Sequence, residues 1–313
     1  MTIKRFFTDE LKYKGEIGFH LCYFIHYVYR KIKTRGGIVA TIERKFKSSF
    51  HRKIDWENPK TMNEKIQWLK LNAYEPFHTI CADKYRVREY LDERIGKGIG
   101  QIPVLYKTDN WKDITIDVLP NEAFVVKANH TQGDVWIFRN KSEVNINRLR
   151  TACRWALKRD IYSVTGEKQY KDIKPQIIVE KLLLKKDGHI PNDYKLHFFN
   201  GKLEFVYCSV DREGMNKRNI YDSDWNPIIM AWSGPYVDPV ESRGPEILAP
   251  KSLEKMKEYG EIIAKDFKYV RVDYYDVDGV LYFGEITMHH GSGFDIFVPD
   301  RYDLFFGEKL NLG

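Results

Sequence analysis

The chain has 313 residues, of which 43% are hydrophobic and 14% aromatic, and its formal net charge is +7. This length and composition exclude a disordered chain and are typical of a folded protein with two or three subdomains. The charge is uneven, because residues 1–53 hold 13 Lys and Arg against 4 Asp and Glu, which leaves 38 against 40 in the remainder. The nearly neutral main body argues against nucleic-acid binding.

The cysteines are far apart in the sequence and form no C-x-x-C pair. They are Cys22, Cys81, Cys153 and Cys208. This spacing indicates neither a zinc site nor a disulfide framework, so we expect reduced thiols in the cytoplasm. The first residues are polar and charged, which is unlike a secretion signal.

The N-terminal part, from about Lys4 to Phe50, is predicted to form basic helices. Its apolar run from Phe19 to Tyr29 is too short and too rich in histidine to span a membrane. Because "RKIKTR" follows this run, one interpretation is an amphipathic helix on an anionic membrane surface. The simpler interpretation is a helix docked on the body with its basic face in water.

Helices and strands are predicted in turn through the first half of the body. Thr61 and Glu64 have the spacing of a capping box, which predicts a helix that buries Ile66, Leu69 and Trp68. Further elements are a helix from about Thr79 to Arg94, a short strand in "QIPVLYKTD", a buried strand in "NEAFVVKANH" ending at Lys127, a return strand in "DVWIFRN" and a helix over Asn145–Asp160.

The second half is predicted to consist mainly of hairpins. Residues 174–213 indicate three strands, with turns at Asp187-Gly188 and Asn200-Gly201. Residues 219–235 are expected to be rich in loops, Ser252–Asp266 to be helical, and residues 269–288 to form a hairpin turning at Asp278-Gly279. Helices that alternate with antiparallel hairpins predict the α+β or mixed α/β class.

The last hairpin brings charged side chains together. Side chains alternate along a strand, so Arg271 and Asp273 share one face, and Glu285 and Thr287 share a face of the next strand. Asp273 and Glu285 can then lie on neighbouring strands and hold Mg²⁺, with nucleotide phosphates as further ligands. Arg271 can neutralise charge on a transferred phosphoryl group. From this hairpin alone, a cross-strand Arg–Asp pair on a solvated face is an equally good interpretation.

The segment "VRVDYYDVDGVLYFGEIT" followed by "GSG" resembles the C-terminal metal-binding segment of the ATP-grasp superfamily. Three earlier segments resemble other motifs of that superfamily in the expected order. They are "ADKYRVREYL", "FVVKANH" and "QIIVEKLL". Together with "NPKTMNEKIQWLKLN" and "DYKLHFFNGK", the set resembles the TupA-like branch, which is associated with teichuronopeptide and other surface-polysaccharide gene sets. The similarity covers about Asn58 to Phe297.

The resemblance implies an α+β ATP-grasp fold, in which two α/β subdomains clamp ATP between antiparallel sheets. It implies a basic helical extension over residues 1–55 and an N-terminal α/β subdomain over 56–120. A lid subdomain with a phosphate lysine and the adenine hinge would follow over 121–190, and a C-terminal subdomain with the metal and substrate site over 191–313.

The resemblance also implies a role for each matching residue. ATP would be bound by Lys84 and Lys127 at the phosphates, Glu180 with the backbone of Lys181 and Leu182 at the adenine, and Asp193 near the ribose. Mg²⁺ would be bound by Asp273, Glu285 and Thr287, the last standing where many relatives have asparagine. The reacting groups would be contacted by Arg271 and by the loop Gly291, Ser292 and Gly293. Substrate contacts are assigned to Lys217, Arg218, His289 and His290.

Three histidines and one acidic pair allow other interpretations. His289 and His290 are adjacent on a strand and face opposite ways, so we do not expect them to bind one metal; one of them is a candidate proton acceptor. His130 is either a phosphate contact or a loop histidine. Asp276 and Asp278 have the D-x-D spacing of many glycosyltransferases, but a following glycine at a hairpin tip favours a turn.

The function implied is an ATP-dependent carboxylate–amine ligase that forms an amide through an acyl phosphate. Its partners would be a small carboxylate and amine, which include sugar-nucleotide or glycan-linked compounds of bacterial capsule synthesis, and no nucleic acid. We expect a cytoplasmic protein, with peripheral contact to the inner face of the membrane through the basic N-terminus. The alternatives are a glycosyltransferase, an ATP-dependent sugar kinase on the same fold, and a degenerate nucleotide-binding module without catalysis.

Overall fold

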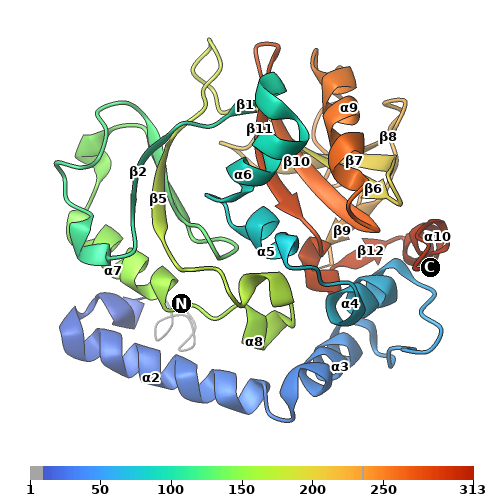
Figure 1. Cartoon of the computed structure of the whole chain (residues 1–313), viewed down its shortest axis with the longest axis horizontal. Helices are drawn as coiled ribbons and strands as arrows, with labels where there is room; N and C mark the ends of the chain where they lie inside the picture. Colours follow the sequence, from blue (N-terminus) through green and yellow to red (C-terminus); the bar gives the residue numbers. More distant parts are fainter. Residues whose placement is uncertain (1–9, 235) are drawn as a thin grey trace. The chain divides into compact units, whose positions relative to one another are not determined.

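The computed structural model describes residues 10–234 and 236–313, which divide into two compact units (Figure 1). Unit 1 takes in the chain up to Arg44, Val104–Gly166 and Lys174–Lys181; unit 2 takes in Lys45–Pro103, Glu167–Ile173 and Leu182–Gly313. Both units combine helices with antiparallel sheets, so the predicted α+β class is confirmed. No helix of the described residues is long and apolar enough to cross a membrane. The four cysteines all lie within the described residues, where they are buried and form no disulfide.

Unit 1 is built on a four-stranded antiparallel sheet with the strand order β2-β5-β3-β4. Its strands are β2 (Val104–Thr108), β3 (Phe124–Ala128), β4 (Val135–Phe138) and β5 (Ile177–Lys181). Its helices and helical turns are η2 (Leu11–Tyr13), α2 (Gly15–Lys33), the first part of α3 (Gly37–Phe50), η4 (Trp111–Asp113), η5 (Lys141–Glu143), α7 (Ile146–Leu157) and α8 (Tyr162–Thr165). Helix α7 packs on one face of the sheet, where Leu149 and Cys153 contact Phe124 and Val126 in one buried cluster.

Unit 2 is built on a six-stranded sheet with the order β1-β11-β10-β6-β7-β8. Its strands are β1 (Gly100–Gln101), β6 (Asp193–Phe199), β7 (Lys202–Val210), β8 (Lys217–Asp222), β10 (Tyr269–Val277) and β11 (Val280–Thr287), and β9 (Ala231–Ser233) pairs separately with β12 (Ile296–Val298). Its helices and helical turns are α4 (Met62–Asn72), α5 (Phe77–Ala82), α6 (Val87–Arg94), η3 (Gly96–Gly98), η6 (Lys168–Tyr170), α9 (Leu253–Ala264), η7 (His290–Gly293) and α10 (Arg301–Lys309).

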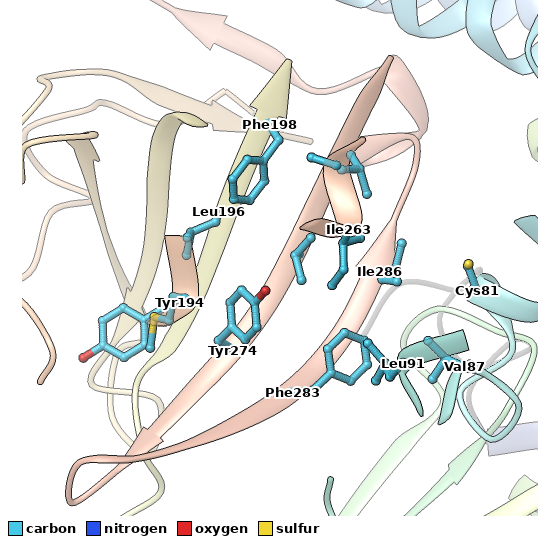
Figure 2. Close-up of a cluster of buried hydrophobic side chains, with 14 of the residues drawn as sticks. Cys81, Val87, Leu91, Tyr194, Leu196, Phe198, Ile263, Tyr274, Phe283 and Ile286 are labelled. Atoms are coloured by element: carbon cyan, nitrogen blue, oxygen red, sulfur yellow. The ribbon is translucent and has the colours of Figure 1, made fainter. Parts of the chain in front are cut away.

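The two faces of the unit 2 sheet differ because side chains alternate along each strand. One face carries Leu196, Val272 and Ile286, which pack beneath α9 in the cluster drawn in Figure 2. Helix α9 approaches closely at Gly260, where an added Cβ would lie 2.2 Å from the ring of Phe198. The opposite face therefore receives the intervening side chains of β6, β10 and β11, and these include the charged residues of the three strands.

Most predicted elements are present, and their local signals are visible. The capping box at Thr61 and Glu64 begins α4, and the turn at Asn200-Gly201 uses left-handed φ angles of 48° and 85°. The turn at Asp278-Gly279 does the same, with 54° and 90°. The basic N-terminal helices are present as α2 and α3, whereas Lys4–Asp9 lie outside the described residues.

Two predictions were wrong. The single helix over Thr79–Arg94 is interrupted between α5 and α6, because the Asp83 carboxylate accepts hydrogen bonds from the amides of Tyr85 (2.8 Å) and Arg86 (3.3 Å) and so competes with the helix. Residues 219–234 are rich in loops over 223–230, as expected, but they also contribute to β8 and form β9, which was not predicted. Strand β8 gains its hydrogen bonds from β7, which local sequence does not reveal.

Candidate active site

The charged face of the unit 2 sheet gathers the predicted metal residues and Arg271. In the strand register Asp273 lies opposite Glu285 on one side and Lys195 on the other. Arg271 lies opposite Thr287. The predicted arrangement of the last hairpin is therefore confirmed, and β6 adds Lys195 to it.

An ion-pair network connects these side chains. The Arg271 guanidinium donates to both oxygens of Asp273, from Nε to Oδ1 (2.6 Å) and from Nη2 to Oδ2 (2.8 Å). Its Nη2 also lies 2.5 Å from Glu285 Oε1. Lys195 Nζ lies 3.0 Å from Asp273 Oδ2 and also contacts Asp193. Two cations thus bridge three carboxylates, which leaves one net negative charge.

Burial makes this network sensitive to the loss of any member. Burial raises the pKa of Asp273 to about 6, although Arg271 and Lys195 act in the opposite direction. Burial alone would lower the pKa of Lys195, but Asp193 and Asp273 raise it above its usual value. The charged form of each group therefore depends on its partners.

The donor set fits magnesium. Asp273 and Glu285 provide carboxylate oxygens from adjacent strands, and Thr287 Oγ1 lies 3.3 Å from Glu285 Oε1. Hard oxygen donors of this kind suit Mg²⁺, which keeps several waters or phosphate oxygens as further ligands. The Glu285 side chain is 39% exposed, so an incoming ion can reach it. Within residues 10–234 and 236–313, no group of three His, Cys, Asp or Glu side chains has metal-binding geometry.

His290 lies against Arg271, as part of the same face. Its Nδ1 is 3.0 Å from Arg271 Nη1 and its Nε2 is 3.5 Å from Asp295 Oδ2. Burial and the nearby Arg271 hold the pKa of His290 well below its usual value. A neutral imidazole with Nδ1 as acceptor orients the arginine, and we expect this role in place of proton abstraction.

Arg218 and Lys217 point to opposite faces of β8. Arg218 pairs in register with Ser209, which pairs with Asp193, so Arg218 lies on the charged face. Burial raises the pKa of Asp295, and the positive charge of Arg218 offsets part of this increase. Lys217 Nζ instead contacts the backbone oxygen of Glu241 at 2.5 Å. Of this pair, Arg218 lies on the sheet face that also carries the predicted metal residues, and Lys217 lies on the other.

The Gly-Ser-Gly loop has an unusual backbone. Gly291, Ser292 and Gly293 all have left-handed φ angles, of 54°, 55° and 66°. A Cβ at Gly291 would lie 2.1 Å from the Asp295 carboxyl carbon, and one at Gly293 would lie 2.5 Å from Gln67 Nε2. Glycine is therefore required at both positions, while Ser292 is a rare non-glycine residue in this region.

Helix α4 holds this loop in place. Gln67 Nε2 donates to the backbone oxygens of Ser292 (3.0 Å) and Gly293 (2.6 Å). Lys70 Nζ donates to Gln67 Oε1 (2.9 Å), to Ser292 Oγ (2.8 Å) and to the Ser292 backbone oxygen. A trans peptide directs its N–H opposite to its C=O, so the Gly293 amide points away from α4.

His289 and His290 lie after the end of β11, so the expectation that they are strand residues is wrong, although their side chains have different partners. His289 Nδ1 lies 3.0 Å from Gln169 Nε2 and 3.6 Å from Glu167 Oε1. His289 lines a cavity of about 260 Å³, together with Lys70 and His78. The two histidines therefore lie in different surroundings, and a shared metal is excluded for them.

In unit 1, Lys127 and Glu180 lie on the same face of the sheet. Their Nζ and Oε2 atoms are 2.6 Å apart, and both side chains are largely buried. The neighbouring Val135 and Ile137 of β4 are 44% and 46% exposed, and their register places them on this face too. An ammonium group beside an exposed apolar strip is chemistry that suits a nucleotide, with its charged phosphates and flat base.

Asn129 connects the end of β3 to the segment that leads into β5. Its backbone N–H donates to the Gln176 oxygen (2.9 Å), its Nδ2 to the Lys174 oxygen (3.0 Å), and its Oδ1 accepts from the Gln176 amide (2.8 Å). The next residue, His130, is buried, with Nδ1 3.2 Å from Asn129 Oδ1.

The other predicted nucleotide residues have varied surroundings. Lys84 is half-buried in the turn between α5 and α6, where its backbone oxygen accepts from Arg88. Lys181 pairs with Glu122 at 2.9 Å, Leu182 is buried, and Asp193 begins β6 beside Lys195. Asp193 joins the Arg271–Asp273 network, because Lys195 contacts both Asp193 and Asp273.

The D-x-D pair serves the hairpin turn. Asp276 Oδ2 accepts from the amide and hydroxyl of Ser252 (3.0 and 2.7 Å), and its Oδ1 accepts from the Gly279 amide (2.6 Å). Asp278 Oδ2 accepts from the Lys186 amide (2.8 Å). The preference for a turn at this position is confirmed.

Two residues in this region were missed by the sequence reasoning. Lys195 is two residues after Asp193 in a strand, so strand alternation could have placed it beside Asp193, but its contact with Asp273 requires the pairing of β6 with β10. Lys70 contacts Ser292 across 222 positions of sequence, and no local signal predicts that contact.

Three comparisons relate the chain to known proteins. The family profile described as TupA-like ATPgrasp matches residues 64–311. None of the curated proteins compared with the chain matches it. Among solved structures, the chain is similar to D-alanine–D-alanine ligase from Bacillus anthracis, with 20% identity, coverage of 67% of this chain and 56% of that chain, and a TM-score of 0.39. It is also similar to L-amino acid ligase from Bacillus licheniformis, with 12% identity, coverage of 87% and 60%, and a TM-score of 0.46. The chain thus spans little more than half the length of these proteins.

Proposed function

The chain belongs to the TupA-like ATP-grasp family, and from this premise we propose that it is an ATP-dependent ligase that joins a carboxylate to an amine. The observation that supports this most is the network of Arg271, Asp273, Glu285 and Lys195 on neighbouring strands of the unit 2 sheet. It offers oxygen ligands for Mg²⁺ next to a guanidinium that can stabilise a phosphoryl group.

In this proposal ATP phosphorylates the carboxylate, which gives an acyl phosphate and ADP, and the amine then displaces phosphate to form the amide. Bound Mg²⁺ would supply charge neutralisation for the phosphate oxygens. Asp273 and Glu285, with Thr287, are the residues that would hold it. Arg271 would contact the transferred group.

For the binding of ATP, the proposal assigns a role to each predicted nucleotide residue. Lys127 would contact the phosphates, and the apolar strip of Val135 and Ile137 on the same face suits the adenine. Glu180 would contact the adenine of ATP, together with the backbone groups of Lys181 and Leu182. Lys84 would add a second phosphate contact and Asp193 a ribose contact, as the family resemblance implies.

The Gly-Ser-Gly loop is proposed to bind the acyl phosphate. The outward direction of the Gly293 amide supports this, because an N–H aimed away from α4 can donate to an incoming oxyanion. Arg218 is the proposed cation for the acid substrate, since it shares the charged face. Lys217, which turns to the opposite face, has no such support.

The finer proposal concerns the substrates and the place of action. We propose that the acid is a sugar acid or an amino acid used in capsule or other surface-polysaccharide synthesis in the cytoplasm. The association of the TupA-like branch with such gene sets supports this. Among the alternatives, a glycosyltransferase is disfavoured, because the carboxylates of Asp276 and Asp278 accept backbone hydrogen bonds in the hairpin turn.

The test is incubation of the protein with ATP, Mg²⁺ and pooled sugar acids and amines, followed by mass spectrometry. We expect a product whose mass equals acid plus amine minus water, together with ADP. A phosphorylated sugar as the only product would show a kinase on the same fold. No consumption of ATP with any pool would support the non-catalytic module and overturn the proposal.

A further inference from the structure

Helix α2 has two apolar faces, and only one of them is packed against the rest of unit 1. The packed face carries Phe19, Tyr23 and His26, whose rings lie 5.8, 6.2 and 4.9 Å from the ring of Trp155 on α7. Arg154 lies over Phe19 at 4.0 Å. These contacts hold the orientation of the helix within unit 1, so its other face is turned outward.

The outward face of α2 is an exposed apolar stripe. It consists of Ile17, Leu21, Phe24, Val28 and Ile32, which are 85%, 47%, 62%, 38% and 66% exposed. Their spacing of three and four residues places them along one side of the helix. The expected docked helix with exposed basic residues is present, and it carries an exposed apolar stripe as well. A contiguous apolar stripe of this kind marks an interaction surface.

The charges around the stripe are positive. Lys14 precedes the helix, Lys31 and Lys33 lie in its last turn, and Arg35 follows it. All four side chains are exposed. Glu16 is the only acidic residue of α2, and it is paired with Arg154 at 2.8 Å. The surface therefore presents apolar side chains and lysines without an uncompensated carboxylate.

We propose that α2 binds in the plane of an anionic membrane surface through the stripe of Ile17, Leu21, Phe24, Val28 and Ile32. Apolar side chains enter the boundary between headgroups and acyl chains, while lysine and arginine meet the lipid phosphates. The charge complementarity favours a lipid surface over a second copy of this basic helix, because two such helices repel each other. The proposal does not depend on the ligase activity.

The test is co-sedimentation of the full chain with vesicles of phosphatidylcholine alone or mixed with phosphatidylglycerol. We expect binding to the anionic vesicles, weakened by salt, and little binding to the neutral ones. Phe24→Asp should reduce the partition coefficient between vesicles and water by about tenfold or more, because it replaces an aromatic ring that would enter the membrane with a charge. Replacement of both Lys31 and Arg35 by Glu should weaken binding to the anionic vesicles only.

A matched control is Leu248→Asp, which changes a side chain that is 92% exposed and lies in unit 2. It should bind vesicles as the unchanged protein does. Phe24→Asp should keep the thermal unfolding midpoint, since Phe24 is mostly exposed. The proposal is overturned if the protein does not bind the anionic vesicles or if Phe24→Asp leaves binding unchanged. It is equally overturned if the protein forms dimers that Phe24→Asp dissociates while vesicle binding is absent, because the stripe is then a self-association surface.

Discussion

Arg271 and Asp273 form a two-point ion pair within a single strand, with Nε 2.6 Å from Oδ1 and Nη2 2.8 Å from Oδ2. The pair is buried, and its arginine also bridges to Glu285 on the next strand. The planar guanidinium fixes the orientation of the Asp273 carboxylate. The proposed metal ligands are thereby oriented before any metal binds.

Glu285→Gln should reduce ATP-dependent turnover at least about a hundredfold, because an amide is a poor ligand for a hard divalent cation and removes one negative charge. ADP release measured with saturating substrates checks this. Asp278→Asn is the matched control, since it changes a carboxylate on the same hairpin that serves the turn. Equal activities of the two variants would contradict the assigned metal site.

Lys195→Met should destabilise the protein by about 3 kcal/mol, because it leaves Asp273 and Asp193 buried without this cation. Urea unfolding measures the change in the free energy of unfolding. The double variant Asp193→Asn with Lys195→Met should recover part of the loss, since it removes one of the two stranded charges. A double variant less stable than the sum of both single changes would argue against the pairing.

Lys127→Ala should raise the dissociation constant of ATP by about tenfold or more, because it removes a phosphate-binding cation. Calorimetric titration with a non-hydrolysable ATP analogue and Mg²⁺ measures this. Lys174→Ala provides the control in the same unit, because the Lys174 side chain is exposed and pairs with Asp109. If both variants bind the analogue as the unchanged protein does, Lys127 is not a phosphate ligand.

Lys70 should make the protein more stable as pH rises above neutrality. Burial lowers the pKa of Lys70 to about 7, against the attraction of Glu167, whereas an unfolded lysine titrates near about 10.4. Between these two values the unfolded chain binds more protons at this residue, so the free energy of unfolding rises with pH by up to about 1.4 kcal/mol per unit. In the Lys70→Met variant, the free energy of unfolding should no longer increase with pH over this range. Urea unfolding of both proteins from pH 6 to 10 checks it, and parallel curves would contradict it.

Local patterns were sufficient for part of the fold and of the site. Strand alternation placed Arg271 and Asp273 on one face, and the left-handed turn residues at Asn200-Gly201 and Asp278-Gly279 were recognisable in the sequence. The pairing of Asp273 with Glu285 also needs the register shift between Asp273 and Tyr274, which the sequence did not predict. The capping box at Thr61 marked the start of α4. Each of these depends on residues close in sequence or on a tight hairpin.

The remainder depends on contacts between distant segments. Lys70 reaches Ser292 only because α4 packs against the loop after β11, and Lys195 meets Asp273 only through the pairing of β6 with β10. The interruption of the helix at Asp83 was missed because a side-chain cap outweighed helical periodicity. The sequence left two interpretations of α2 open, because periodicity alone does not tell which face of an amphipathic helix is packed.

Asn129 fixes which side of the unit 1 sheet Lys127 occupies. Its three hydrogen bonds to residues 174 and 176 set the alignment of β3 against β5. A slip of one residue would turn every side chain of β3 to the other face and separate Lys127 from Glu180. A buried amide that contacts no nucleotide in the proposal thus determines whether the nucleotide lysine is presented at all.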